Sequence, residues 1–440
     1  MLKVFNQKNL LILCWIEAIL YLIQAFLKHY FFEMDLLYPA ESVVFLGIVI
    51  TAVVYYAKER PAIKVSVDII MLLVMFLWLI LSCAVRTISG GEDFFTSNSN
   101  YISDFETIFI VYLLGRYSAK TEIPKRIRIV LQALLIVVSA LMAYILFIIF
   151  TNRSIDTPNS GFIGMRFGTA FQINCHRNYV GAGAMILVLL CLFLIFRSKH
   201  TGLKILYSVL FAIHYIALII SSSRTGLISA VVGFAAMITV MVYNRCNAFS
   251  TGKRVLVSVG SSLISGAIFF LMRYPIYALY SYIVGNFGGN SLNSRVIMDA
   301  SAATLSSRTV IWRYCMQIIT TPRTLLTGVT PEGVAGALLD VSNNGLRYPH
   351  AHNQILEVGV ALGIPALIAF AVWLVIIAIR SLKVLITGKR NTLIMVVPFL
   401  ILAIMLDNMA ERYCLFYGYF ISYIFFFLCG YISNFGKVKK

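Results

Sequence analysis

Long apolar runs separated by short polar segments recur along the whole 440-residue chain. Each run is close to the length of about 20 residues that an α-helix needs to cross a bilayer core of about 30 Å. We expect one membrane-spanning helix in each of twelve such runs, so the pattern predicts an all-α polytopic membrane protein. The runs lie near residues 9–27, 41–57, 65–85, 103–117, 128–150, 180–196, 203–221, 226–243, 255–272, 354–379, 392–409 and 413–433.

The chain shows no internal repeat and no low-complexity linker that would divide it. We therefore expect a single integral membrane domain over residues 1–440. Lys3 and Lys8 precede the first apolar run, which begins at Leu10, and no small-residue cleavage site follows it. This arrangement predicts an uncleaved first membrane helix, not a signal peptide.

Lysine and arginine gather in alternate loops, which indicates how the chain is oriented. Cytoplasmic loops of membrane proteins carry an excess of these residues. If the N-terminus is cytoplasmic, twelve crossings return the C-terminus to the same side. That side then holds 23 of the 36 cations and only two acids, Glu59 and Glu122. The cytoplasmic loops in this arrangement are 58–64, 116–128, 197–204, 245–254 and 380–390.

Composition excludes a soluble protein and explains the net charge. Hydrophobic residues make up 60% of the chain and charged residues 12%, against about 25% charged in soluble domains. The formal net charge is +18. Because the excess of cations lies on the predicted cytoplasmic side, it reflects topology, and no nucleic acid is expected as a partner. The eight cysteines are scattered, which predicts neither a zinc site nor a disulfide framework.

The cations predicted on the outer side are almost all arginine, with Lys28 as the one lysine against twelve arginines. The planar guanidinium group binds phosphate through two parallel hydrogen bonds. This bias predicts a phosphate-bearing ligand at the outer face. Some of these arginines are expected to pair instead with outer acids such as Asp299, Glu332 and Asp340.

Two predicted exterior segments are longer than the others, 151–179 and 273–353. The second is long enough to fold. Ser306 or Ser307 can cap a helix whose apolar residues recur at helical spacing, and Pro322 follows its expected end. We expect a short amphipathic helix here, lying on the outer face of the bundle.

The segment from Tyr348 to Asn353 contains the strongest candidate for chemistry. His350 and His352 directly precede the tenth predicted helix, which is expected to begin at Asn353 or Gln354. The positive end of a helix dipole disfavours a protonated imidazole, so His352 is expected to be neutral and able to accept a proton. The alternative is a histidine that caps or anchors the helix.

Three other exterior segments place an arginine beside a helix end. Arg224 lies in the hairpin 221–226, Arg177 enters the sixth predicted helix, and Arg308 opens the sequence Ser307–Trp312. Charged residues at the membrane are costly enough to suggest a function by default. Polar residues within the predicted helices, namely Glu17, Asp68 and His214, are expected to pair inside the bundle.

Together and in this order, the segments resemble the O-antigen ligase and O-antigen polymerase superfamily of bacterial envelope glycosyltransferases. The ligase signature is a histidine, then Asn, Ser or Gln, then nine residues, then Gly-x-x followed by Gly, Thr or Val. His352-Asn353 is followed by nine residues and Gly363, whereas Ala366 departs from the pattern at its last position.

Other parts of the resemblance lie upstream of this motif. The family's order is kept by three of them: Ser223–Gly226, the Arg-x-x-x-Trp segment at 308–312, and Gly328. The resemblance covers about residues 170–370, which we expect to form a ligase- or polymerase-like core that includes the exterior loop 273–353.

The resemblance implies a GT-C-like glycosyltransferase in the bacterial cytoplasmic membrane, with its active site facing the periplasm or exterior. Its members take a glycan from an undecaprenyl-diphosphate carrier and transfer it to an acceptor hydroxyl. The implied partners are this lipid-linked donor, a glycan or lipid-linked acceptor, and membrane lipids. The implied mechanism is inverting and uses no metal and no cofactor.

The resemblance also assigns roles to residues. His352 would activate the acceptor hydroxyl, and Arg224 is the best match for a ligand of the donor diphosphate. Apart from the resemblance, Glu357 lies about one helical turn beyond His352 and is expected to orient the imidazole or bind a sugar hydroxyl, and Arg347 is a candidate from its position in the sequence alone. The remaining candidates for binding diphosphate or sugar are Arg177, Arg308, His350 and Asn353.

Metal dependence is one alternative. Glu33 with Asp35, and Asp104 with Glu106, are acid-x-acid pairs of the kind that other lipid-linked sugar transferases use to hold a divalent cation.

A transporter or lipid-linked oligosaccharide flippase is the alternative from another class, since twelve helices suit both. Transporters tend to show repeated halves with sites near the midplane. This chain shows no such symmetry and places its polar residues in outer loops, which favours an enzyme. The sequence leaves polymerase and ligase undecided.

Overall fold

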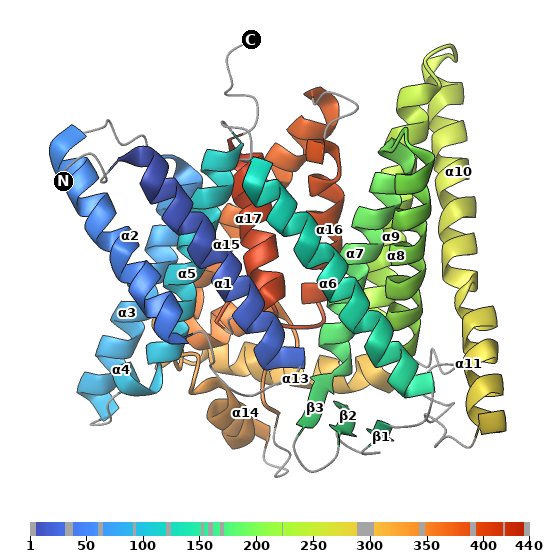
Figure 1. Ribbon diagram of the computed structural model, residues 1–440. Coiled ribbons are helices and arrows are strands. Elements are labelled where there is room, and N and C mark those ends of the chain that lie inside the picture. The colour runs from blue at the N-terminus through green and yellow to red at the C-terminus, as the bar shows by residue number, and fades with distance from the viewer. Residues whose placement is uncertain are drawn as a thin grey trace.

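The fold is a bundle of long helices, seen in a computed structural model (Figure 1). The polytopic helical architecture predicted from the sequence is confirmed. The structure describes residues 6–30, 38–59, 65–90, 94–119, 125–150, 154–156, 162–167, 171–221, 223–287, 303–342, 348–387, 393–416 and 419–434.

The first half of the chain forms six helices, a small sheet and two more helices. They are α1 (Gln7–Tyr30), α2 (Tyr38–Glu59), α3 (Val67–Gly90), α4 (Phe94–Ser97), α5 (Ser99–Ser118), α6 (Lys125–Phe150), β1 (Ser154–Asp156), β2 (Phe162–Phe167), β3 (Phe171–His176), α7 (Arg177–Arg197) and α8 (Thr201–Ile220).

The regular elements among the described residues of the second half are all helices. Its elements are α9 (Arg224–Arg245), α10 (Thr251–Leu271), α11 (Arg273–Phe287), α13 (Ala303–Thr320), α14 (Val334–Ser342), α15 (Gln354–Thr387), the 3-10 helix η2 (Leu393–Met395), α16 (Val397–Asn408) and α17 (Phe420–Ser433).

Every predicted membrane run overlaps a helix. Within the described residues, nine helical stretches are long and apolar enough to cross a membrane: α1, α2, α3, α6, α7, α8, α9, α10 with α11, and α15. The remaining three runs correspond to α5, which carries Asp104, Glu106 and Arg116, and to the shorter apolar helices α16 and α17. The number of crossings therefore stays a prediction.

The segment 151–179 contains β-structure that the sequence analysis did not predict. β1, β2 and β3 form a three-stranded antiparallel sheet in that order, with Phe162 opposite His176 and Phe167 opposite Phe171. The sequence of β3 alternates apolar and polar residues, which is the period of a strand. A membrane helix needs a far longer apolar run, so a scan for such runs overlooks this pattern.

The two ends of the bundle differ in what they carry (Figure 1). The start of α1, the end of α17 and the α7–α8 and α9–α10 turns lie at one end. The sheet, α13 and α14 lie at the other end, beside the start of α15. The Lys- and Arg-rich turns thus lie at the same end of the bundle as the start of α1 and the end of α17, as the predicted topology requires. Which end faces the cytoplasm stays a prediction.

The long segment 273–353 is more helical than expected. α11 follows α10 after a single residue, so the helical structure extends well past the predicted end of the ninth run. The amphipathic helix predicted near Ser306 is present as α13, which ends at Thr320 before Pro322. Its apolar face is buried and packs against α14 and α15. The buried residues on this face are Ile311, Cys315, Ile318 and Ile319.

A break in α15 receives the loop that follows α13. Gly363 interrupts the helix with φ 81° and ψ −177°, and Pro365 lies two residues later. The amides of Val329 and Thr330 donate to the carbonyls of Val360 and Ala361 at 2.9 and 2.8 Å. Because the break would otherwise leave these carbonyls without partners, the loop completes the helix's hydrogen bonding.

Asp68 pairs inside the bundle, as predicted. Its buried carboxylate accepts hydrogen bonds from Tyr112 and Arg116 of α5 and from Arg380 of α15, the last at 2.6 Å. His214 likewise contacts the Ser139 hydroxyl at 2.8 Å. The Asp68 cluster ties α3, α5 and α15 together.

We expect Asp68→Asn to lower the free energy of unfolding by about 3 kcal/mol, because it leaves the charges of Arg116 and Arg380 without a buried counter-charge. The thermal midpoint of the purified protein in one detergent measures this loss. Glu59→Gln is the control, since the Lys58–Glu59 pair at 3.2 Å is about half exposed and should be worth less than 1 kcal/mol. Equal midpoints for the two variants would contradict a stabilising role for the cluster.

Candidate active site

In the turn before α15, Asn353 caps the helix, so the His352 imidazole does not act as the cap. The Asn353 side chain caps the helix, accepting hydrogen bonds from the amides of Ile355 and Leu356 at 3.0 and 3.1 Å. His352 has a left-handed backbone with φ 48°, a conformation that His adopts more readily than most residues. The alternative of a capping histidine is therefore replaced by a capping asparagine.

Glu357 stabilises this turn through both of its carboxylate oxygens. One of its carboxylate oxygens accepts the Ala351 amide at 2.8 Å, and the other accepts from Arg412 at 2.9 Å. The side chain is fully buried. Its oxygens contact the main chain and an arginine, and the expected role of Glu357 toward the imidazole or a sugar hydroxyl stays a prediction.

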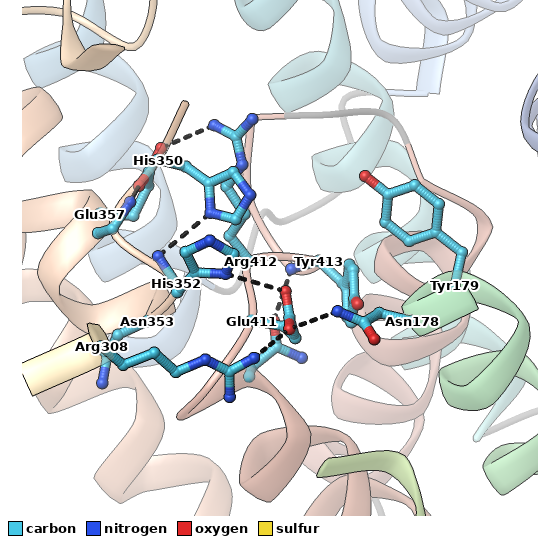
Figure 2. Close-up of polar contacts among 12 residues, drawn as sticks. Asn178, Tyr179, Arg308, His350, His352, Asn353, Glu357, Glu411, Arg412 and Tyr413 are labelled. Atoms are coloured by element: carbon cyan, nitrogen blue, oxygen red, sulfur yellow. Dashed lines mark hydrogen bonds and ion pairs between the residues drawn. The ribbon is translucent and has the colours of Figure 1, made fainter. Parts of the chain in front are cut away.

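Glu411, in the segment between α16 and α17, is the carboxylate that faces the imidazole (Figure 2). Its Oε2 lies 3.4 Å from His352 Nδ1, and its Oε1 accepts from Arg308 at 2.7 Å and from Asn178 at 2.8 Å. Three elements thus converge on one side chain: α7, α13 and the turn before α15. A carboxylate at Nδ1 favours the tautomer that leaves Nε2 able to accept a proton.

The side chains of Glu411, His352 and Arg308 differ in how exposed they are to solvent. The Glu411 side chain is 4% exposed, whereas that of His352 is 25% exposed and that of Arg308 is 20% exposed. A substrate can therefore reach the imidazole and the guanidinium group but not the carboxylate between them. His350 lies against the His352 ring, with 3.8 Å between the ring centroids.

The hairpin that carries Arg224 packs against the start of α7. Ser223 caps α9 by accepting from the Gly226 amide at 3.2 Å, and a Cβ on Gly181 would lie 2.2 Å from the Ser223 Cβ. This close approach brings the first turns of α7 and α9 together, and therefore the backbone of Arg177 near that of Arg224.

Two buried residues extend the site beside the hairpin. Asp407, near the end of α16, lies close enough to both Glu411 and Arg308 for their charges to act on it. Tyr413 packs edge-on against Tyr179, with 5.2 Å between ring centroids. Burial raises the pKa of the Tyr413 hydroxyl well above its ordinary value, so this group stays protonated.

The structure thus brings His350, His352 and Arg308 together. Arg347 lies outside the described residues, and so does the side chain of Arg177. Asn353 has structural contacts, since it caps α15 and its Nδ2 donates to the Met409 carbonyl at 3.0 Å, and its role in binding substrate stays a prediction.

Sequence reasoning missed Glu411, Asn178 and Arg412 as partners in the site. The expected partners of the outer arginines were Asp299, Glu332 and Asp340, whereas Arg308 and Arg412 pair with Glu411 and Glu357. The signal available in the sequence was an acid beside an arginine at 411–412, between the last two apolar runs.

A metal has one candidate location among the described residues. Donor atoms of His350, His352 and Glu411 lie within 4.8 Å of one another, and two histidines with a carboxylate are zinc-type ligands. However, Glu411 Oε1 already accepts from Arg308 and Asn178, so a cation would compete with a fixed positive charge.

The acid-x-acid pairs offer less for a metal. Glu33 and Asp35 lie outside the described residues. Asp104 and Glu106 lie in α5, where residues two apart do not face each other. The described residues therefore offer one candidate metal location, and metal independence stays a prediction.

The geometry agrees with a family match. Residues 206–371 match the family model described as O-antigen ligase. This match supports the resemblance of this segment to the O-antigen ligase superfamily. No curated protein matches the chain.

The O-antigen ligase segment contains part of the site and omits the rest. It includes Arg224, Arg308 and His352, and it ends before Glu411. Glu411 and Asn178 are therefore contributed by flanking parts of the chain. The O-antigen ligase segment also contains Gly328 and Gly363, where the loop after α13 meets the break in α15.

Proposed function

We propose that this protein is a membrane glycosyltransferase that moves a glycan from an undecaprenyl-diphosphate carrier to an acceptor hydroxyl at the outer face of the bacterial cytoplasmic membrane. The observation that carries the proposal is the partly exposed His352 imidazole, faced at Nδ1 by Glu411 and accompanied by Arg308. The family match supports a lipid-linked glycan as the substrate class. The acceptor is either a growing glycan or a lipid-linked core.

The reaction follows from the chemistry of these groups. His352 Nε2 takes the proton of the acceptor hydroxyl as its oxygen bonds to the anomeric carbon of the donor sugar. The bond from that carbon to the diphosphate oxygen breaks in the same displacement, and the electron pair leaves with the lipid diphosphate. A single displacement inverts the anomeric configuration. The histidine's gained proton is stabilised by Glu411.

Arginine supplies the remaining stabilisation. Arg308 and Arg224 would hold the donor diphosphate and offset the negative charge that develops as it leaves. No step requires a metal. The predicted topology places this end of the bundle outside, because the Lys- and Arg-rich turns lie at the opposite end (Figure 1).

The test is glycan transfer by the full-length purified protein in liposomes, from a lipid-diphosphate-linked oligosaccharide to an acceptor glycan. We expect wild-type protein to release lipid diphosphate and to keep its rate in excess EDTA. Absence of transfer with several donor and acceptor pairs, alongside movement of intact donor across the bilayer, would favour the transporter instead. Loss of the rate in EDTA, restored by a divalent cation, would overturn the metal-free mechanism.

Arg308→Gln is expected to raise the donor KM by about tenfold and to lower kcat, because it removes one charge-assisted contact to the diphosphate worth about 1.5–3 kcal/mol. Arg313→Gln is the matched control, since Arg313 lies on the same helix but is exposed. Donor kinetics at fixed acceptor concentration separate KM from kcat. Equal kinetic constants for the two variants would remove Arg308 from the donor site.

A further inference from the structure

A pocket lies at the end of the bundle opposite the candidate active site. Its volume is about 280 Å³, and it is formed where α7, α9 and the start of α16 meet. Its inner wall is apolar, with Phe193, Met237 and Phe399 all less than 10% exposed. This volume is close to the lower limit of about 300 Å³ for ligand pockets in proteins. It can therefore hold a small headgroup and the first carbons of a chain.

Cationic side chains line the same pocket. Arg197 is the last residue of α7 and Arg245 the last residue of α9, and both are exposed. Neither makes an ion pair or side-chain hydrogen bond to another residue in the described part of the chain, and the lining contains no acid. Two guanidinium groups at the ends of neighbouring helices therefore border an apolar cavity without an internal counter-charge.

We propose that this pocket binds an anionic phospholipid, with its phosphate between Arg197 and Arg245 and the start of an acyl chain against Phe193 and Met237. Basic pockets between transmembrane helices at the cytoplasmic side bind anionic lipid headgroups in this manner. The apolar wall favours a lipid over a soluble phosphate as the ligand. A soluble anion would leave the buried Phe and Met surfaces of the pocket without an apolar partner. This site is separate from the proposed catalytic function and does not depend on it.

The position of the two arginines supports this assignment. Arg197 and Arg245 are each the last residue of a helix that is long and apolar enough to span a membrane. Their guanidinium groups therefore lie where lipid headgroups lie. Phe196, 41% exposed, lines the same cavity next to Arg197. This ring offers an exposed apolar surface beside the guanidinium group, where the first carbons of an acyl chain would lie.

The test is native mass spectrometry of the delipidated full-length protein, titrated with phosphatidylglycerol or with phosphatidylcholine of the same acyl chains. We expect wild-type protein to bind one phosphatidylglycerol at least tenfold more tightly than phosphatidylcholine. Arg197→Gln with Arg245→Gln should weaken phosphatidylglycerol binding about 30-fold, which corresponds to about 2 kcal/mol for two lost contacts. Lys204→Gln with Lys253→Gln removes two exposed cations from the same end outside the pocket, and its affinity should stay within threefold of wild type.

Met241→Trp tests the apolar half of the site. Met241 lines the pocket, so an indole there fills space while both arginines remain, and phosphatidylglycerol binding should fall at least tenfold. Wild-type affinity in either pocket variant would overturn the proposal, as would equal binding of the two lipids. Displacement of phosphatidylglycerol by glycerol phosphate at the same concentration would show a site for free phosphate esters and would also overturn it.

Discussion

We expect His352→Ala to lower kcat for glycan transfer by about 10²–10⁴-fold, the range contributed by a positioned general base. The donor KM stays within about threefold, because the imidazole acts on the acceptor proton in the transition state and not on the diphosphate. Initial rates with saturating acceptor and varied donor measure both constants. His200→Ala is the control, since His200 is exposed at the start of α8, at the other end of the bundle (Figure 1).

The role of Glu411 is tested together with that of His352. Glu411→Gln retains an oxygen for Arg308 and Asn178 but can present an NH₂ group to His352 Nδ1. That amide favours the opposite tautomer, in which Nε2 carries the proton and cannot accept one. We expect kcat to fall about 10²-fold in Glu411→Gln, measured per folded protein because loss of the buried charge that pairs with Arg308 also lowers the thermal midpoint. Glu332→Gln, which changes a carboxylate that accepts from Tyr101, should leave kcat unaltered.

The double variant decides whether the two residues act as a unit. If Glu411 works only through the imidazole, His352→Ala with Glu411→Gln is no slower than His352→Ala alone. Additive losses would mean that Glu411 acts independently, for example by fixing Arg308 at the diphosphate. A full rate in His352→Ala would remove the general base from the mechanism altogether.

Glu411 also explains how the site holds its shape. One carboxylate contacts His352, Arg308 and Asn178, so the proposed proton acceptor and a proposed diphosphate ligand are positioned by the same buried charge. In the proposed reaction, this arrangement would link binding of the donor to activation of the acceptor. A displacement of α13 or of the start of α7 changes the environment of the imidazole without touching it.

The sequence predicted local features well because local patterns determine them. Each apolar run of about 20 residues overlaps a helix, since a membrane helix needs that length. The end of α13 at Thr320 agrees with the proline that follows, and α15 begins at one of the two residues expected. These features depend on neighbouring residues alone.

The sequence did not predict which side chains meet across the bundle. Glu411 lies 59 positions after His352, and no spacing rule relates them. Glu357 was assigned to the imidazole because it is close in sequence, but its oxygens reach Ala351 and Arg412 instead. Long-range pairing depends on how α13, α15 and the last two helices pack, and a single sequence contains no direct record of that packing.

Gly363→Ala is expected to prevent accumulation of folded protein. The conformation of Gly363, with φ 81° and ψ −177°, belongs to a region essentially restricted to glycine, and a non-glycine residue there costs about 1–3 kcal/mol. A Cβ would also lie 2.5 Å from the Leu326 carbonyl oxygen. Relieving that clash moves the loop away and breaks the bond from the Ile364 amide to the Leu325 carbonyl.

Gly328 is the matching position on the loop, with φ 63° and a Cβ that would lie 2.3 Å from the Ala361 carbonyl. Strain and the lost hydrogen bonds add to about 4 kcal/mol or more for either substitution, a large part of the 5–15 kcal/mol that stabilises a typical protein. We expect the yield of monodisperse protein to fall at least fivefold in Gly363→Ala and in Gly328→Ala.

Gly336→Ala in α14 is the control, because a Cβ there meets no atom within 4 Å and alanine favours a helix. Its yield and thermal midpoint should equal or exceed those of wild type. If Gly363→Ala folds normally but loses activity, the motif glycine serves the chemistry and not the fold. If Gly363→Ala folds and transfers glycan normally, a glycine at this position is not needed for the loop to pack against α15. The expected result, loss of fold at both glycines, would make this part of the family motif a structural support for His352 eleven residues away.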